Sequence, residues 1–159
     1  MPDTARPYRA LYCSRIAPRL LPRLDEGLRE IMAASIRNNA PSRISGLLVA
    51  HDGWFVQALE GPELAVQRRL DIIRADPRHT ELKVIARTEA TTRAFPQWSM
   101  CAYGLSPADS AILGTLSGKE FDPSRWSEAS AMRLLTTVSL IHARVLAERY
   151  EAELARPAA

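Results

Sequence analysis

Hydrophobic and polar residues alternate along residues 8–103 in two ways, with a period of two in some segments and of three to four in others. Alternation with a period of two predicts a strand, and recurrence every three or four residues predicts a helix. The segments with strand-like alternation are 8–14, 44–51, 54–60, 82–90 and 98–103. Helical spacing runs from Pro22 to Asn39 and from Pro62 to Asp76, and residues 15–20 form a loop. Asp52-Gly53, between two strands, is typical of a two-residue hairpin turn.

The order of these segments predicts a fold class. A strand, a helix, two strands, a helix and a strand in succession, with one strand added, are typical of the split βαβ or ferredoxin-like fold. We therefore expect an α+β protein with a mixed sheet of five strands. Both helices would lie on one face of that sheet.

The pattern changes after Leu105. Residues 107–116 predict a short helix, 118–123 a linker, and 124–154 a long helix. Its apolar residues on one side are Leu134, Leu135, Val138, Ile141, Val145 and Leu146. This stripe is short for a coiled coil, so we expect the C-terminal helices to pack on the open face of the sheet, with partner or dimer contacts in addition. The chain would divide into a domain at 7–105 and a helical extension at 106–159.

Composition narrows the class of protein. The 159 residues are 47% hydrophobic and 25% charged, which is ordinary for a folded domain. The net charge of +3 comes from interleaved acidic and basic residues, whereas nucleic-acid binding usually clusters positive charge. No apolar run approaches ~20 residues, and the N-terminus lacks the apolar stretch of a signal peptide. We expect a cytoplasmic protein that binds neither nucleic acid nor a membrane.

The usual signs of an enzyme are missing from the sequence. His51, His79 and His142 are far apart, and none stands near a carboxylate at ligand spacing. Cys13 and Cys101 have no metal-site spacing. The chain also lacks a glycine-rich phosphate loop and a nucleophile elbow. The sequence thus predicts neither a metal site nor a catalytic site.

Polar residues stand where the pattern predicts burial. Period-two alternation places Gln57 on the same face as Phe55 and Leu59, and Tyr12 lies inward on the first strand. Asn38-Asn39 ends the first helix, where a C-terminal cap accounts for one asparagine but not for both. A buried amide or phenol costs stability unless it finds hydrogen-bond partners. A Tyr12–Gln57 pair closing on itself remains an alternative, but a flat heteroaromatic ligand would satisfy the whole set.

Six segments of the chain form a recognisable set. They are LYCSR at 11–15, RNNA at 37–40, ISGLL at 44–48, FVQALEG at 55–61, DPRH at 76–79 and FPQWSM at 95–100. Taken together, these segments resemble the BLUF family of blue-light sensors that use FAD. The resemblance runs in order over roughly residues 7–105. It implies a non-covalently bound FAD whose ring stands between the two helices, with FMN or riboflavin as possible substitutes.

The resemblance also implies roles for individual residues. Tyr12 matches the family's electron- and proton-donating tyrosine, and Gln57 the glutamine between that tyrosine and the flavin. Trp98 and Met100 match strand residues that exchange positions near Gln57 when the state changes. The residues implied to contact the cofactor are Ile31, Ser35, Asn38, Asn39, Phe55, Gln57, Arg78 and His79.

The expected function is that of a blue-light photoreceptor rather than an enzyme. Light would drive a reversible transfer between Tyr12 and the flavin, which rearranges the hydrogen bonds of Gln57. The signal would leave through the last strand and the C-terminal helices to a separate protein, and the resemblance implies a homo-oligomer. Two alternatives stay open, which are a flavin-dependent enzyme insensitive to light and a ligand-free interaction module.

Overall fold

A computed structural model describes residues 5–96, 101–104 and 120–157, with 101–104 as backbone. The five strands are β1 (Tyr8–Ile16), β2 (Ser45–His51), β3 (Trp54–Gly61), β4 (His79–Glu89) and β5 (Cys101–Gly104). They form one sheet in the order β4-β1-β3-β2-β5, antiparallel except for the β2–β5 pair. The expected helix over 107–116 and the residues Trp98 and Met100 lie outside the described residues.

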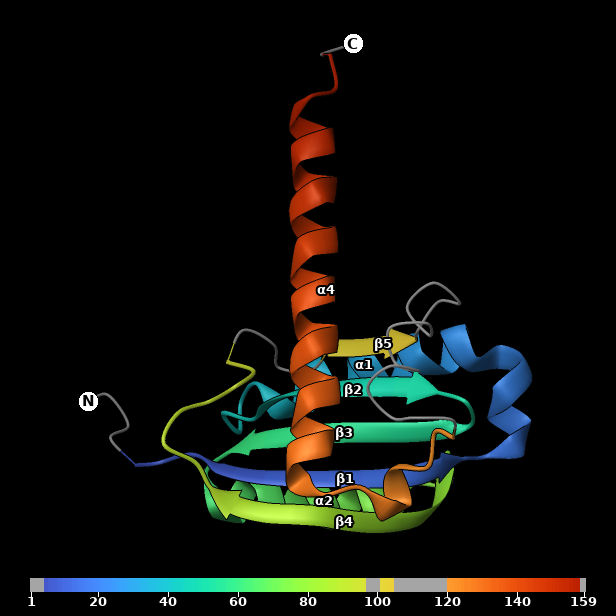
Figure 1. Cartoon of the computed structure of the whole chain (residues 1–159), viewed down its shortest axis with the longest axis vertical. Helices are drawn as coiled ribbons and strands as arrows, with labels where there is room; N and C mark the ends of the chain where they lie inside the picture. The colour runs from blue at the N-terminus through green and yellow to red at the C-terminus, as the bar shows by residue number, and fades with distance from the viewer. Residues whose placement is uncertain (1–4, 97–100, 105–119, 158–159) are drawn as a thin grey trace.

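The sheet separates two hydrophobic cores. Helices α1 (Leu24–Asn39) and α2 (Glu63–Arg74) lie behind it in Figure 1, and α4 (Glu128–Leu154) crosses its front. Tyr12 and Phe55 pack on the side of α1 and α2, whereas Cys13 and Val56 pack on the side of α4. This inversion between neighbouring residues is the period-two alternation of a strand. The predicted α+β, ferredoxin-like fold is confirmed.

Several predicted boundaries are corrected by pairing between distant segments. β1 continues to Ile16 because the Ile16 N–H donates to the Gly53 carbonyl and Ile16 pairs with His79. The same pairing starts β4 at His79 rather than at residue 82. The rest of the predicted loop becomes a 3-10 helix, η1 (Pro18–Arg23), and α1 begins after it.

The hairpin between β2 and β3 agrees with its sequence. Asp52 and Gly53 both have positive φ, at 48° and 78°. Two successive residues in this region are typical of the type I′ turn, whose twist matches that of the strands it joins. The turn fixes the register in which Leu48 faces Gln57 across the strand pair.

The long C-terminal helix begins later than predicted. A short 3-10 helix, η2 (Pro123–Arg125), precedes it, and the Ser127 hydroxyl caps it by accepting the Ser130 N–H at 3.2 Å. Of the predicted stripe, Leu134, Leu135 and Val138 are buried against the sheet, whereas Leu146 is exposed. Packing on the open sheet face is therefore confirmed for the first part of α4. Within the described residues, no helix is both long and apolar enough to cross a membrane.

A buried carboxylate ties the end of β3 to the chain after β4. Glu60 is fully buried, and it accepts the backbone N–H groups of Ala94 at 2.8 Å and Phe95 at 3.1 Å. Burial raises the pKa of Glu60, and the nearby Arg9 together with these N–H groups offsets part of the rise. Phe95 packs in the core beside α4, and Gln57 lies on β3 together with Glu60. The hydrogen bonds of Glu60 therefore join the segment that contains Phe95 to the strand that carries Gln57.

Candidate functional site

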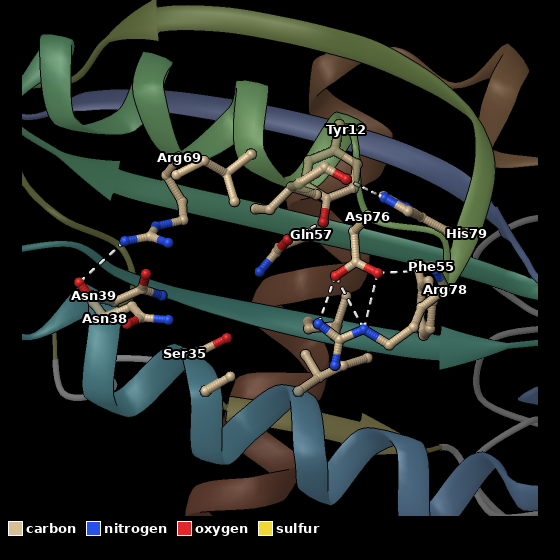
Figure 2. Close-up of a pocket in the computed structure, with 15 residues that line it drawn as sticks. Tyr12, Ser35, Asn38, Asn39, Phe55, Gln57, Arg69, Asp76, Arg78 and His79 are labelled. Carbon is tan, nitrogen blue, oxygen red and sulfur yellow. Dashed lines mark hydrogen bonds and ion pairs between the residues drawn. The ribbon is translucent and has the colours of Figure 1, made fainter.

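A cavity open at one mouth lies between α1, α2 and the sheet (Figure 2). Its enclosed volume is about 120 Å³, and the volume is about 620 Å³ when the open space at the mouth is included. The described residues that the sequence analysis singled out for the photoreaction or for cofactor contact all line it: Tyr12, Ile31, Ser35, Asn38, Asn39, Phe55, Gln57, Arg78 and His79. The fold thus brings together residues that the sequence spreads over 68 positions, from 12 to 79.

Tyr12 and Gln57 stand directly opposite each other on β1 and β3. The Tyr12 hydroxyl donates a hydrogen bond to Gln57 Oε1. Burial raises the pKa of Tyr12 far above its usual value, and the charge of Asp76 adds to the rise while Arg78 opposes it. Tyr12 is therefore a neutral phenol with a proton to donate.

This pairing sets the direction of the Gln57 amide. Since the phenol is the donor, the oxygen of the amide faces Tyr12 and its NH₂ group faces away. Figure 2 shows that NH₂ group directed into the space between β3 and α1. The Gln57 amide therefore directs a donor, its NH₂ group, towards the cavity and an acceptor, its oxygen, towards Tyr12. A rotation of the amide would exchange these two directions.

The C-terminal end of α1 forms one wall of the cavity. Both Asn38 and Asn39 lie within the helix, and the positive φ that follows belongs to Arg43, at 57°. The alternative that one asparagine is a left-handed cap is therefore wrong. The Asn38 carbonyl accepts a hydrogen bond from Arg69 Nη2 at 3.2 Å, which links the C-terminal end of α1 to the middle of α2.

The turn after α2 supplies a charged corner. Arg78 pairs with Asp76 through its Nε at 3.0 Å and its Nη2 at 2.5 Å. Burial raises the pKa of Asp76, but the hydrogen bonds and the charge of Arg78 outweigh it, and the net shift is downward. Asp76 is therefore ionised at neutral pH, and the pair presents both a cation and an anion to the mouth of the cavity.

His79 is held by the protein on both sides of its ring. Nε2 lies 2.5 Å from the Ile73 carbonyl, to which it donates, and Nδ1 lies 2.7 Å from Ser14 Oγ. The ring meets Tyr12 and Phe55 edge to face, each at 6.3 Å between centroids. His79 thus braces Tyr12 and Phe55, and it lines the cavity with its ring rather than with a nitrogen that is still available.

Six lining residues were given no role in the sequence analysis, although two of them, Leu48 and Asp76, lie within the segments that resemble the family. They are Ala34, Leu48, Arg69, Ile72, Ile73 and Asp76. Helical spacing gives a usable signal for some of them, because Arg69, Ile73 and Asp76 follow one another at steps of four and three. Arg69 had no other signal, since an arginine on an amphipathic helix ordinarily belongs to the solvated face.

The lining fits a flavin ring. Apolar side chains such as Ile31, Leu48 and Phe55 form walls for a flat ring, and the amides of Asn39 and Gln57 lie where the polar edge of a heteroaromatic ring needs donors and acceptors. A second hollow shares Asp76 and Arg78 with the first and extends along η1 and the start of α1. The two hollows therefore adjoin at the Asp76–Arg78 pair.

Comparisons with known proteins agree with this geometry. Residues 8–101 match the BLUF family, described as sensors of blue light using FAD. Photoactivated adenylate cyclase subunit beta of Euglena gracilis is 40% identical over 85 residues, which are 53% of this chain and 10% of that protein. The chain therefore spans about a tenth of the length of the curated relatives that it matches.

Two solved structures share the fold. The photo-activated state of BlsA superimposes with a TM-score of 0.73 at 24% identity, over 82% of this chain and 93% of BlsA. The dark state of the BLUF protein BlrB gives a TM-score of 0.62 at 27% identity, over 85% of this chain and 98% of BlrB. The family match covers more than half of the chain, and it includes the Tyr12–Gln57 pair and the cavity that the pair faces. This chain belongs to the BLUF family, the sensors of blue light that use FAD.

Proposed function

We propose that this chain is a blue-light photoreceptor that binds FAD non-covalently in the cavity between α1 and α2 and has no enzymatic activity in residues 8–101. The observation that carries the proposal is the buried Tyr12–Gln57 hydrogen bond, which ends in an amide directed into the cavity. A light-insensitive flavoenzyme has no need of this relay, and a ligand-free module has no need of the cavity.

The residues have complementary tasks in this proposal. The bound flavin supplies the absorption of blue light and a strongly oxidising excited state. Tyr12 gives up an electron and its hydroxyl proton and then takes both back, because its neutral phenol is within hydrogen-bond reach of Gln57. Gln57 ends with its amide rotated or tautomerised, so that the pattern of donors and acceptors towards the cavity is changed.

Other residues hold the cofactor. Ile31, Ser35 and Phe55 would flank the ring, and Asn38 and Asn39 would meet its polar edge. Arg78 lies where the first hollow opens into the second, so it would contact the ring or the start of the tail. His79 would support the ring through Phe55 and Tyr12. FMN shares the ring with FAD, so it is an expected substitute.

The proposal is tested by the colour of the protein and by its response to light. The purified protein should be yellow, and blue light alone should shift its absorption reversibly to the red. A colourless protein that takes up no added flavin would favour the ligand-free module. A yellow protein that bleaches only in the presence of a reductant would favour the enzyme.

The second hollow gives a prediction about the tail of the cofactor. Arg19 lies in this hollow, where its Nη2 donates to the Pro77 carbonyl at 3.4 Å. Reversing its charge in Arg19→Glu should weaken FAD binding by roughly three- to tenfold, because an exposed charge acts on a diphosphate through screening solvent. Riboflavin carries no phosphate, so its affinity should stay the same.

Quenching of flavin fluorescence on titration measures both affinities. Arg29→Glu is the matched control, since Arg29 is exposed on α1 outside the linings of both hollows. Equal losses of FAD and riboflavin affinity in Arg19→Glu would contradict a tail site in the second hollow. That result would leave the ring site in the first hollow untouched.

The output of the sensor is proposed to be a changed surface. In this proposal the chain has a flavin-binding domain at residues 7–105 and a helical extension at 106–159. The signal would pass through the last strand of the domain and the C-terminal helices to a separate signalling protein. The support for this route is that β5 pairs with β2, whose neighbour β3 carries Gln57, and that α4 packs on the opposite face of these strands.

A further inference from the structure

Arg69 brings a guanidinium to the cavity from the middle of α2. The side chain is half-buried, lines the cavity and reaches towards the C-terminal end of α1 (Figure 2). Its Nη2 donates to the Asn38 carbonyl, but its Nε is buried and has no hydrogen-bond partner among the described residues. A buried N–H group without a partner is unfavourable. A ligand that accepts a hydrogen bond from Arg69 Nε would therefore complete the site.

The charge of Arg69 is not balanced by a neighbouring carboxylate. The cavity is lined by two arginines, Arg69 and Arg78, and by one carboxylate, Asp76. Asp76 is taken up by Arg78, whose Nη2 lies 2.5 Å from its Oδ2. No ion pair among the described residues involves Arg69. The cavity thus has one uncompensated positive charge, and its apolar walls screen that charge less than water would.

These two features together select a class of ligand. The oxygen-bearing edge of a flavin ring offers carbonyl groups that accept hydrogen bonds, and reduction by two electrons leaves this part of the ring negatively charged at neutral pH. A guanidinium beside that edge would bond to it in both redox states, but more strongly in the anionic one. The amides of Asn39 and Gln57 line the same cavity and are neutral, so they favour the reduced form less.

We propose that Arg69 is a further cofactor-contacting residue, which donates from Nε to the oxygen-bearing edge of the flavin ring and makes the bound flavin easier to reduce. The inference rests on the proposed function, because it takes the occupant of the cavity to be a flavin. Two different nitrogens are involved, Nη2 at the Asn38 carbonyl and Nε at the ring. Arg69 can therefore hold the end of α1 and the ring at the same time.

The test compares how tightly oxidised and reduced riboflavin bind to variants of the full chain. Riboflavin is the probe because it has no phosphate, so only the ring site is measured. Arg69→Met should weaken the binding of oxidised riboflavin about fivefold and that of reduced riboflavin about fiftyfold, since a charge-assisted hydrogen bond is lost. This tenfold difference lowers the midpoint potential of the bound flavin by about 30 mV for a two-electron couple.

Fluorescence quenching measures the affinity for the oxidised form, and anaerobic titration against a redox dye measures the midpoint potential. Arg69→Gln keeps a donor for the Asn38 carbonyl but removes the charge, so it should lower the potential by a similar amount. Arg68→Met is the matched control. Arg68 is the neighbouring arginine on α2, is exposed and lies outside the linings of both hollows, so its loss should leave the affinity and the potential unchanged.

The outcomes separate this inference from the proposed function. Equal losses of affinity for the two redox forms in Arg69→Met would mean that Arg69 only joins α1 to α2, and would overturn the inference. An unchanged potential in both Arg69 variants, or an equal drop in Arg68→Met, would overturn it as well. In each of these cases a wild-type protein that is yellow and responds to light leaves the proposed function standing. A wild-type protein that takes up no riboflavin would overturn both.

Discussion

Gln57→Leu is expected to leave the protein yellow and to abolish its reversible red shift under blue light. The leucine fills a similar volume, so the walls of the cavity remain, but it removes the acceptor for the Tyr12 hydroxyl and the donor directed into the cavity. Without an amide there is no group that can exchange donor and acceptor. Absorption spectra before, during and after illumination measure the effect.

Two comparisons make this result specific. Tyr12→Phe removes the other end of the same hydrogen bond and should abolish the shift while the flavin stays bound. Gln67→Leu makes the same chemical change on α2, where the Gln67 amide bonds Glu63 and lies outside the cavity, and it should keep a normal shift. A normal photocycle in Gln57→Leu would refute the proposed role of the amide.

Leu135→Ala is expected to destabilise the protein by about 2–5 kcal/mol, the range seen for large-to-small changes in cores. Leu135 is fully buried between α4 and the sheet, in the cluster that contains Cys13, Val56 and Phe95. The truncation removes this contact and leaves a cavity that rigid strands fill only in part. Urea unfolding followed by circular dichroism measures the free energy of unfolding.

A matched leucine shows whether burial is the cause. Leu64 is 67% exposed on α2, so Leu64→Ala should change stability by less than about 0.5 kcal/mol. Equal stabilities for the two variants would contradict the packing of α4 on the sheet. The same packing indicates where the chain can be shortened. A deletion that starts at residue 124 removes the core residues Leu135 and Val138, whereas a deletion that starts after residue 140 leaves both in place.

Local pattern was sufficient for most of the fold. Period-two alternation assigned Gln57 to the face of Phe55, and it did so because successive strand residues point to opposite faces whatever the strand pairs with. The Asp52-Gly53 turn was predictable for a similar reason, since a type I′ turn needs positive φ that these residues tolerate. Boundaries were less predictable, because Ile16 and His79 are strand residues only through their pairing with each other.

The candidate site was predictable in part. Tyr12 and Gln57 were detectable as polar residues on faces that the pattern assigns to the core. The family motifs then predicted that these residues lie beside a bound flavin. Arg69 had no such signal, because its role in joining the two helices depends on the Asn38 carbonyl 31 positions earlier in the chain. His79 was expected at the cofactor, and the structure adds that its nitrogens serve Ser14 and Ile73.

The inward-facing residues of this protein could be assigned from local pattern alone, because the period of a strand or helix is a local property of the backbone. The same pattern was enough to predict the fold class and most of the residues around the cavity. The contact between Tyr12 and Gln57, which turns the amide NH₂ of Gln57 towards the cavity, follows from the pairing of β1 with β3. Packing also determines where the burial of α4 ends: Val138 is its last fully buried residue, and Leu140, Leu146, Tyr150 and Leu154 beyond it are exposed. Both depend on distances between segments far apart in the chain, and such distances follow from packing rather than from local spacing.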